Sequence, residues 1–481
     1  MDTETMRSEQ PAAAAVAPQP EAQPDKAKQP DMLMVDPDDK KAVRRSILQL
    51  AGPSLVEMIL TNLTQMLSMI MVGRLSPEAV AAVGLTNQPF FLIIAIFSTL
   101  NVGTTVIVAR SIGAGRIEDA DRAAGQAFLL NVLFSIVMIS LSFWFAKDLL
   151  RLMGGEADVV AHGLSYAKLI YLSMGFTILA MAFNSVLRGA GDTRTPMKIN
   201  VAANIIVVLL GYPLIYGIGS FGGFGLTGAA MATGISQCIA MVWVTLIMFS
   251  GKYKVKLKWR NLFRLELGMI SRICKIGFPS ALEQIVMRLG MLVFFKVAAS
   301  LGTLALAATQ IAFNIFGMSF MPGMAFAIAA STLVGQALGA RKPELAEKFG
   351  WQVRRLGIYV AGAIGIGFIV LARQIMMLYT TDVEIIEMGA LSLRIMGFIQ
   401  VSQATQFILS GALRGAGDTR YPLYSTFIGV WGFRVVLCLV FVYGFKTGLY
   451  GIWLAAAADQ FVRSLLIVRR FRKGVWKTMR V

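Results

Sequence analysis

Long apolar stretches, separated by short polar loops, run through almost the whole chain. A helix needs about 20 apolar residues to cross a hydrocarbon layer at about 1.5 Å per residue, and most of these stretches are longer. The pattern predicts an all-α polytopic membrane protein with twelve spans. The expected spans are 46–73, 79–110, 119–147, 161–188, 196–217, 225–250, 272–300, 304–338, 347–373, 387–413, 421–445 and 448–471.

The second half of the chain repeats the first. The string LRGAGDTR occurs at Leu187–Arg194 and again at Leu413–Arg420, a displacement of 226 residues. The same displacement relates Glu57 to Glu283. Internal repeats of this kind are typical of secondary transporters. Two pseudo-symmetric bundles of six spans each are therefore expected.

Basic residues predict which side of the membrane each loop faces, because Lys and Arg are retained in cytoplasmic loops. They gather in alternate loops, such as 110–122 and 188–198, whereas the opposite loop 216–224 carries none. Both termini are therefore expected in the cytoplasm of a cell-membrane protein. The expected divisions are a disordered cytoplasmic tail at 1–40, a first lobe at 41–250, a basic cytoplasmic linker at 251–271, a second lobe at 272–472 and a basic cytoplasmic tail at 473–481.

Composition narrows the range of functions. The chain is 56% hydrophobic with a mean hydropathy of +0.66, values that the surface of a soluble protein would not tolerate. Its formal net charge of +18 is spread over short inner loops and the C-terminal tail. Membrane topology and anionic lipid account for this charge better than nucleic acid does, and no nucleic-acid partner is expected.

Residues for catalysis or metal binding are scarce. Cys238, Cys274 and Cys438 lack the spacing of a metal or redox motif. The single histidine, His162, stands at the outer start of the fourth span, where an interfacial role explains it better than catalysis. The glycine-rich turns open no phosphate-binding sequence. We expect no metal, no cofactor and no use of ATP, and a membrane-embedded enzyme is the least favoured reading.

Ionisable residues inside a bilayer are costly, so they are the first candidates for function. Glu57 in the first span is followed on the same helical face by Thr61 and Ser68. A carboxylate with hydroxyls at this spacing could hold a proton or a hard cation. Asn200 and Asn204, one turn apart in the fifth span, are expected to complete this cation-coupling site. The alternative is that these amides and hydroxyls only join helices, through hydrogen bonds worth about 0.6 kcal/mol each.

At the equivalent positions of the second lobe, only the carboxylate is present. Glu283, with Gln284 and Arg288 on the same helix, forms the second candidate group for coupling or substrate binding. Arg288 could instead neutralise Glu283 in a structural ion pair.

Three further charges predict a structural cluster rather than a transport site. Asp459 and Arg463 are four residues apart in the last span, and Arg434 is on the span before it.

The repeated turn is expected to be structural. Its glycines permit a tight reversal of the chain. Asp192 and Asp418 are each available to cap a helix or to pair with Arg188 or Arg414.

Two features resemble the multidrug and toxic compound extrusion (MATE) family: the segment MVGRLSPEAVAAVGLTNQP at Met71–Pro89, and LRGAGDTRxP before both the fifth and the eleventh span. The likeness covers about residues 41–480. It implies two six-helix lobes that form a V around a central cleft. It also implies that amphiphilic organic cations or other amphiphiles are expelled in exchange for H+ or Na+. The partners expected are such small substrates and membrane lipid, and the protein is expected to be a monomer.

The chain departs from the family pattern at its carboxylates. The acid usual in the family's first helix corresponds here to Ser68, and Glu57 lies three turns earlier on the same face, about 17 Å away. In the seventh helix, the position of an acid in many members is Met287, and Glu283 is one turn closer to the proline. We expect the coupling carboxylate to be displaced rather than absent.

The function expected is alternating access, in which H+ or Na+ binding at Glu57 from outside favours release of the substrate. Protons are slightly favoured, because Na+ would ask for several more oxygens, for which Thr61 and Asn204 are candidates. The alternative is a flippase of the same superfamily, acting on a lipid-linked saccharide or another anionic lipid. An anionic lipid would require a cavity lined by positive charge. Arg288, Arg394 and Arg434 could supply that charge, so this alternative is retained.

Overall fold

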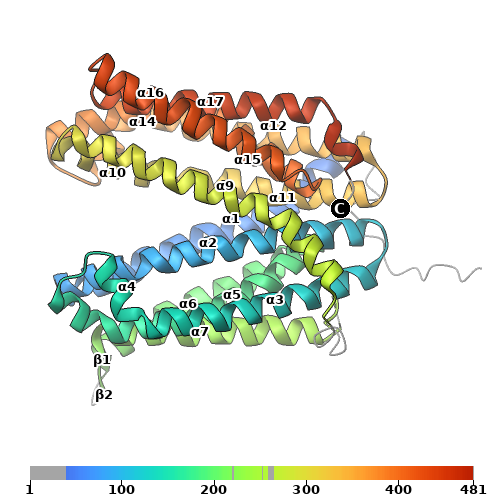
Figure 1. The fold of residues 1–481 in the computed structure, drawn as a ribbon, viewed down its shortest axis with the longest axis horizontal. Helices are drawn as coiled ribbons and strands as arrows, with labels where there is room; N and C mark the ends of the chain where they lie inside the picture. The colour runs from blue at the N-terminus through green and yellow to red at the C-terminus, as the bar shows by residue number, and fades with distance from the viewer. Residues whose placement is uncertain (1–38, 219–220, 252, 258–264, 480–481) are drawn as a thin grey trace, which may run out of the picture.

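The computed structural model describes residues 39–218, 221–251, 253–257 and 265–479, which form two bundles of long helices (Figure 1). The predicted tail at 1–40 lies almost wholly outside the described residues, and the predicted linker at 251–271 lies partly outside them. The first lobe comprises α1 (Lys40–Gly73), α2 (Pro77–Gly113), α3 (Ile117–Trp144), α4 (Ala146–Leu152), α5 (Ala157–Gly189), α6 (Arg194–Tyr216), the hairpin β1 (Gly217–Ile218) and β2 (Phe221–Gly222), and α7 (Gly225–Phe249).

The second lobe repeats this order with two irregular spans. Its eighth span is interrupted at Ser319, and its eleventh span is wound partly as π-helix, an irregularity often found at functional sites. The second lobe comprises α9 (Leu267–Ser300), α10 (Thr303–Met318), α11 (Phe320–Gly339), α12 (Pro343–Val370), α13 (Ala372–Met377), α14 (Val383–Gly415), α15 (Arg420–Phe427), η2 (Ile428–Val435), α16 (Val436–Leu439), η3 (Val440–Gly444) and α17 (Leu449–Arg472), and the short turn η4 (Val475–Thr478) follows.

Length and composition agree with membrane crossing. Eleven helical spans among the described residues are long and apolar enough to cross a membrane, with α10 and α11 counted as one span and α15 to η3 as another. The twelfth long helix is α9, which has 34 residues and carries five charged ones. The prediction of an all-α fold with two pseudo-symmetric six-helix bundles is confirmed.

The two lobes exchange the first turns of their leading helices. Val43, Ile47 and Leu50 at the start of α1 belong to the hydrophobic core of the second lobe, together with residues of α11, α12, α14 and α17. The start of α9 packs in the same way into the core of the first lobe. The residues of α9 at the equivalent positions, 226 further on, are Met269, Ile273 and Ile276. Each lobe therefore completes its core with a helix that belongs mainly to the other lobe.

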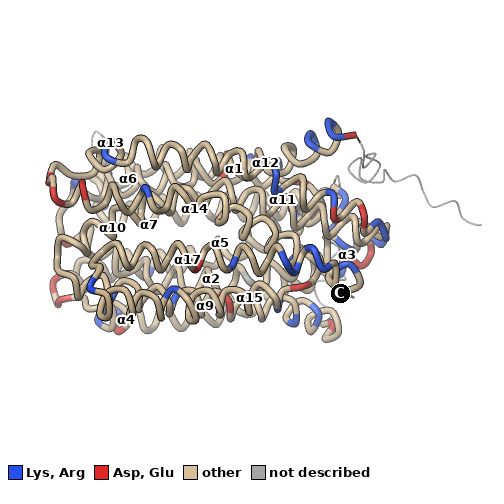
Figure 2. The backbone as a smooth tube through the Cα atoms, turned by 90° about the horizontal axis from the view of Figure 1, so that it is seen from above, with Lys and Arg blue, Asp and Glu red and all other residues tan. Residues whose placement is uncertain are grey.

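The lobes approach each other most closely where α2 crosses α11. A Cβ atom at Gly113 would overlap the backbone oxygen of Gln336, and a Cβ atom at Gly339 would overlap the backbone oxygen of Arg110. Lys and Arg gather most densely at this end of the molecule, which also holds the C-terminus (Figure 2). Toward the opposite end, the ribbons of the two lobes diverge (Figure 1).

The segment predicted as a basic tail is packed rather than free as far as residue 479. Trp476 is fully buried, its ring stacks on Phe471 with centroids 4.6 Å apart, and its indole N–H donates to the backbone oxygen of Phe471 at 2.8 Å. Lys477 pairs with Glu347 at the start of α12. This segment therefore closes the basic end of the second lobe.

Candidate functional site

Glu57 lies at the centre of a buried polar contact in the first lobe. Its side chain projects from α1, and the residue is only 8% exposed. Arg188, at the end of α5, donates from Nη2 to Glu57 Oε1 at 2.6 Å. Asn200 on α6 donates from Nδ2 to the same oxygen at 2.7 Å. Three helices thus meet at one carboxylate oxygen.

A second polar contact lies one helical turn further along. Asn204 Nδ2 donates to Thr61 Oγ1 at 3.1 Å, and the Thr61 hydroxyl donates to the backbone oxygen of Glu57 at 2.8 Å. The structure therefore brings together Glu57, Thr61, Asn200 and Asn204. Ser68 is eleven residues beyond Glu57 on α1, about 17 Å along the helix axis, and does not take part.

One oxygen of this site has no partner. Glu57 Oε2 is buried and accepts no hydrogen bond from the protein, whereas Oε1 accepts two. A buried carboxylate oxygen that lacks a donor is energetically costly, and a proton or a small cation would relieve that cost. The free oxygen is the feature that separates this site from its counterpart in the second lobe.

That counterpart has the same plan but is fully paired. Arg414 donates from Nη2 to both oxygens of Glu283, at 2.9 and 2.7 Å. Thr426 donates from its hydroxyl to Oε1 at 3.1 Å. In both lobes the arginine lies 131 residues after the glutamate, and the third partner lies 143 residues after it. Glu283, unlike Glu57, has a donor on each oxygen.

The arginines of the repeated turn have different partners from those expected. Of the two alternatives for Asp192, the structure shows capping: its Oδ1 accepts the backbone N–H groups of Arg194 and Thr195, both at 3.0 Å. Asp418 accepts from Arg470 at 2.8 Å. The other alternative, a pairing of these aspartates with Arg188 and Arg414, is not formed, because both guanidiniums reach inward to the span carboxylates instead.

Arg288 does not neutralise Glu283. Its side chain is exposed on α9, and among the described residues it forms no ion pair. Gln284, one turn before it, is also exposed. The partners of the two glutamates, Arg188 and Arg414, were not predicted from the sequence. Their equivalent positions in the duplicated motif were the signal that could have indicated a shared role.

The predicted charge cluster is assembled in the second lobe. Asp459, which is fully buried, contacts Arg434 Nη2 at 2.6 Å and Arg463 Nε at 2.9 Å. Further guanidinium N–H groups point at the sulfur atoms of Met291 and Met287. Met287 occupies the position of Thr61 in the first lobe, so the second lobe has a surplus of buried positive charge where the first has neutral hydrogen-bonding groups.

Exposed polar residues within the spans gather on the helices through which the lobes face each other. α1 and α2 of the first lobe pack against α9 and α11 of the second. One contact crosses between the lobes directly, from Asn62 Nδ2 to the sulfur of Met321 at 3.8 Å. The exposed polar residues on these helices and on α10 include Asn62, Gln88, Gln284, Arg288, Gln310 and Asn314.

A set of cross-lobe hydrogen bonds, which we call the clasp, joins the lobes at the basic end. Arg110 on α2 donates to the backbone oxygens of Ala416 at 2.7 Å and of Met479 at 2.8 Å. On α11, Gln336 donates to the backbone oxygen of Gly189 at 3.0 Å.

The clasp also includes the backbone of Arg188. The hydroxyl of Thr332 on α11 donates to the backbone oxygen of Arg188 at 3.0 Å. The residue that pairs with Glu57 is thus itself part of the contact between lobes.

Comparisons with known proteins agree with this architecture. The MatE family model matches residues 53–213 and again 279–440. A probable multidrug resistance protein NorM of Thermotoga maritima is 31% identical over 444 residues, which cover 90% of this chain and 93% of that protein. An uncharacterized transporter of Bacillus subtilis, YisQ, is 26% identical over 90% of this chain and 94% of its own length.

Solved structures show the same fold. The outward-facing conformation of a multidrug resistance MATE family transporter matches with a TM-score of 0.85 and 25% identity, and the match covers 93% of this chain and 97% of that one. The family model covers both repeats, and a relative above 30% identity spans nearly the whole chain. The chain therefore belongs to the MATE family and is a multi-pass membrane transporter, not an enzyme.

Proposed function

We propose that this protein is an ion-coupled antiporter that exports amphiphilic organic cations and other drugs by alternating access. The relatives named as multidrug resistance proteins support a multidrug efflux role. Coupling at the first lobe is our own inference, and the observation that carries it is the buried, unpartnered Glu57 Oε2. Glu283 lacks such an oxygen, and the two arginines of the nearby cluster further disfavour a cation there.

The coupling ion that fits Glu57 best is a proton. Two donors, Arg188 and Asn200, point at Oε1, and N–H groups aimed at a carboxylate leave little room for a metal cation on that side. Sodium would need several oxygen ligands around Oε2. A proton needs only that one oxygen, and the neutral acid can then donate a hydrogen bond.

The contacts of Arg188 supply a route from ion binding to conformational change. A proton on Glu57 removes the negative charge that holds the Arg188 guanidinium. The backbone of Arg188 and the next residue, Gly189, accept the clasp bonds from Thr332 and Gln336 of the other lobe. A shift of Arg188 therefore changes the contact that keeps the lobes together at the basic end.

The orientation of this cycle follows from charge. The basic end belongs on the cytoplasmic side, so the clasp would close the cytoplasmic end while the lobes diverge outward. In that state the exposed amides of α1, α2, α9 and α10 would face the substrate. Amides combined with many Met and Phe side chains suit varied amphiphiles rather than one ligand.

A flippase for an anionic lipid is the second candidate, favoured by one observation. Arg288 on α9 and Arg394 on α14 are both exposed, and neither forms an ion pair among the described residues. Arg434 and Arg463 do not add to this argument, because both are buried within the second lobe against Asp459. These two exposed arginines support this function less well than the Glu57 site supports antiport.

The test is gradient-driven movement of a fluorescent cation such as ethidium in proteoliposomes, under a pH gradient and then a Na+ gradient. Glu57→Gln keeps the shape of the side chain and an oxygen for Arg188 but cannot take up a proton. We expect wild type to respond to the pH gradient and Glu57→Gln to lose that response. Glu283→Gln is the matched control and should keep gradient dependence in the fraction that folds. A folded Glu57→Gln protein with normal coupling would refute the proposal.

A further inference from the structure

We propose that the second lobe holds one structural water at the break between α10 and α11, bound by Gln403, and that the eighth span bends at this hydrated point. The inference concerns a site away from Glu57 and does not depend on which ion drives transport. It rests on a helix break, a cavity and an unpaired buried amide that coincide.

The helical hydrogen-bonding pattern is interrupted between α10 and α11. α10 ends at Met318 and α11 begins at Phe320, so Ser319 separates two helices that together make one span. Pro322 has no N–H, so the carbonyl of Met318 cannot receive the helical bond from four residues on. The equivalent span of the first lobe, α2, runs unbroken for 37 residues. The interruption is thus found in this span of the second lobe and not in its counterpart in the first.

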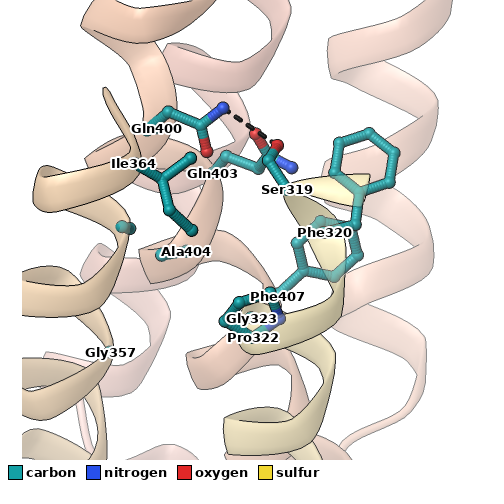
Figure 3. Close-up of a pocket in the computed structure, with 11 residues that line it drawn as sticks. Ser319, Phe320, Pro322, Gly323, Gly357, Ile364, Gln400, Gln403, Ala404 and Phe407 are labelled. Atoms are coloured by element: carbon teal, nitrogen blue, oxygen red, sulfur yellow. Dashed lines mark hydrogen bonds between the residues drawn. The ribbon is translucent and has the colours of Figure 1, made fainter. Parts of the chain in front are cut away.

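A small cavity lies at the break, between α11, α12 and α14 (Figure 3). Its polar wall consists of Ser319, Gln400 and Gln403, and its apolar wall includes Phe320 and Phe407. Gln400 donates from Nε2 to Ser319 Oγ at 2.9 Å, and the Ser319 hydroxyl donates to the backbone oxygen of Phe316 at 2.6 Å. A polar chain therefore leads from α14 to the frayed end of α10.

Gln403 is the part of this wall that lacks a partner. It is only 2% exposed, and neither its amide nitrogen nor its amide oxygen has a hydrogen-bond partner in the protein. Leaving both atoms of a buried amide unpaired is energetically costly. Figure 3 shows Gln403 on the same side of the cavity as Gln400 and Ser319.

The chemistry and size of the site identify its ligand. A cation would satisfy the amide oxygen alone, and an anion would satisfy the amide N–H groups alone. Water both donates and accepts, so it can serve both. The cavity volume open to the centre of a water molecule is about 10 Å³, close to the roughly 10–15 Å³ that one water needs.

The position of this water gives it a mechanical consequence. α10 carries the exposed residues Gln310 and Asn314, whereas α11 carries the clasp residues Thr332 and Gln336. A bend between them can move one half of the span relative to the other. A water that exchanges partners at the break lets the backbone bend without leaving a polar group unpaired.

The first test is the thermal stability of Gln403→Met, which keeps the volume of the side chain but removes both polar groups. If the amide binds water, the variant loses those bonds, and its Tm falls by about 1–3 °C. If the cavity is dry, an unpaired amide has been replaced by an apolar chain, and Tm rises. Gln352→Met, on α12 and outside the cavity, is the matched control. A rise in Tm would overturn the proposal.

The second test detects the water without relying on stability. Short X-ray pulses generate hydroxyl radicals from bound water, which oxidise the aromatic rings beside it. We expect Phe320 and Phe407 to be oxidised in wild type and several-fold less in Gln403→Met. Phe295 and Phe313, whose rings meet edge to face elsewhere in the second lobe, should be unchanged. Equal oxidation of Phe320 and Phe407 in both proteins would also overturn the proposal, whatever the outcome of the transport assay.

Discussion

Arg110 and Gln336 occupy the same position in the two repeats, 226 residues apart, and each donates a hydrogen bond to the duplicated glycine-rich turn of the opposite lobe. The acceptors, Ala416 and Gly189, are at adjacent positions of that turn. The duplicated contact is therefore reciprocal, but its two sides differ in chemistry. Arg110 is a charged donor with two acceptors, whereas Gln336 is a neutral donor with one.

Gln336→Leu should weaken the closed end of the molecule. The lost bond is worth about 1 kcal/mol, which shifts the balance of closed and open forms about fivefold. Lys198 and Tyr424 are exposed and occupy equivalent positions in the two lobes. Spin labels attached to Lys198→Cys and Tyr424→Cys would report the distance between the lobes by double electron–electron resonance. Gln352→Leu is the control. An unchanged distance distribution in Gln336→Leu would show that the bond does not hold the lobes together.

Gly113→Ala should separate α2 from α11. The added Cβ atom would overlap the backbone oxygen of Gln336, and backbone cannot give way as a flexible side chain can. We expect the same label pair to show a longer distance, together with reduced transport. Gly84→Ala on the same helix is the matched control, because a Cβ there meets nothing within 4 Å. If both variants behave alike, the close approach at Gly113 carries no functional weight.

Glu283→Gln should destabilise the second lobe. Arg414 would keep a partly buried charge without its carboxylate, a loss of about 1–3 kcal/mol. Adding Arg414→Met removes that stranded charge and should restore most of the thermal stability measured in detergent. A double variant no more stable than Glu283→Gln would mean that Arg414 is held by other contacts.

The two asparagines of α6 should differ in effect although they are one turn apart. Asn200→Leu removes a donor from the Glu57 carboxylate, so we expect gradient-driven transport to fall several-fold. Asn204→Leu removes only the bond to Thr61, worth about 0.6 kcal/mol, and should leave gradient dependence intact. Initial rates over a series of pH gradients separate the two cases, and equal losses in both variants would place coupling beyond Glu57 itself.

Spans and symmetry could be predicted from the sequence because both depend on repeated patterns: apolar stretches of membrane length, and an identical motif at a fixed displacement. The polar set of the first lobe followed from helical spacing, which put Glu57 and Thr61 on one face and Asn200 and Asn204 on another.

The partner of Glu57 could not be found in that way. Arg188 lies 131 residues after it, and its neighbours Gly189 and Asp192 look like a self-contained turn. Spacing along one helix says nothing about which side chain arrives from another helix. The packing of Trp476 was missed for a related reason. The many Lys and Arg residues around it indicate a solvated tail. One tryptophan hardly changes the composition of that segment, although its buried indole ring fixes where the segment lies.

The bonds of Arg110 also constrain the order in which the molecule can be built. Its acceptors, Ala416 and Met479, are synthesised 306 and 369 residues later. While the ribosome adds those residues, the first lobe lies in the bilayer without these contacts. The Arg110 guanidinium has no acceptor in the second lobe, and α11 does not yet cover Gly113 on α2. Until the second lobe is made, water or lipid headgroups must therefore solvate the Arg110 guanidinium in place of these two carbonyl groups.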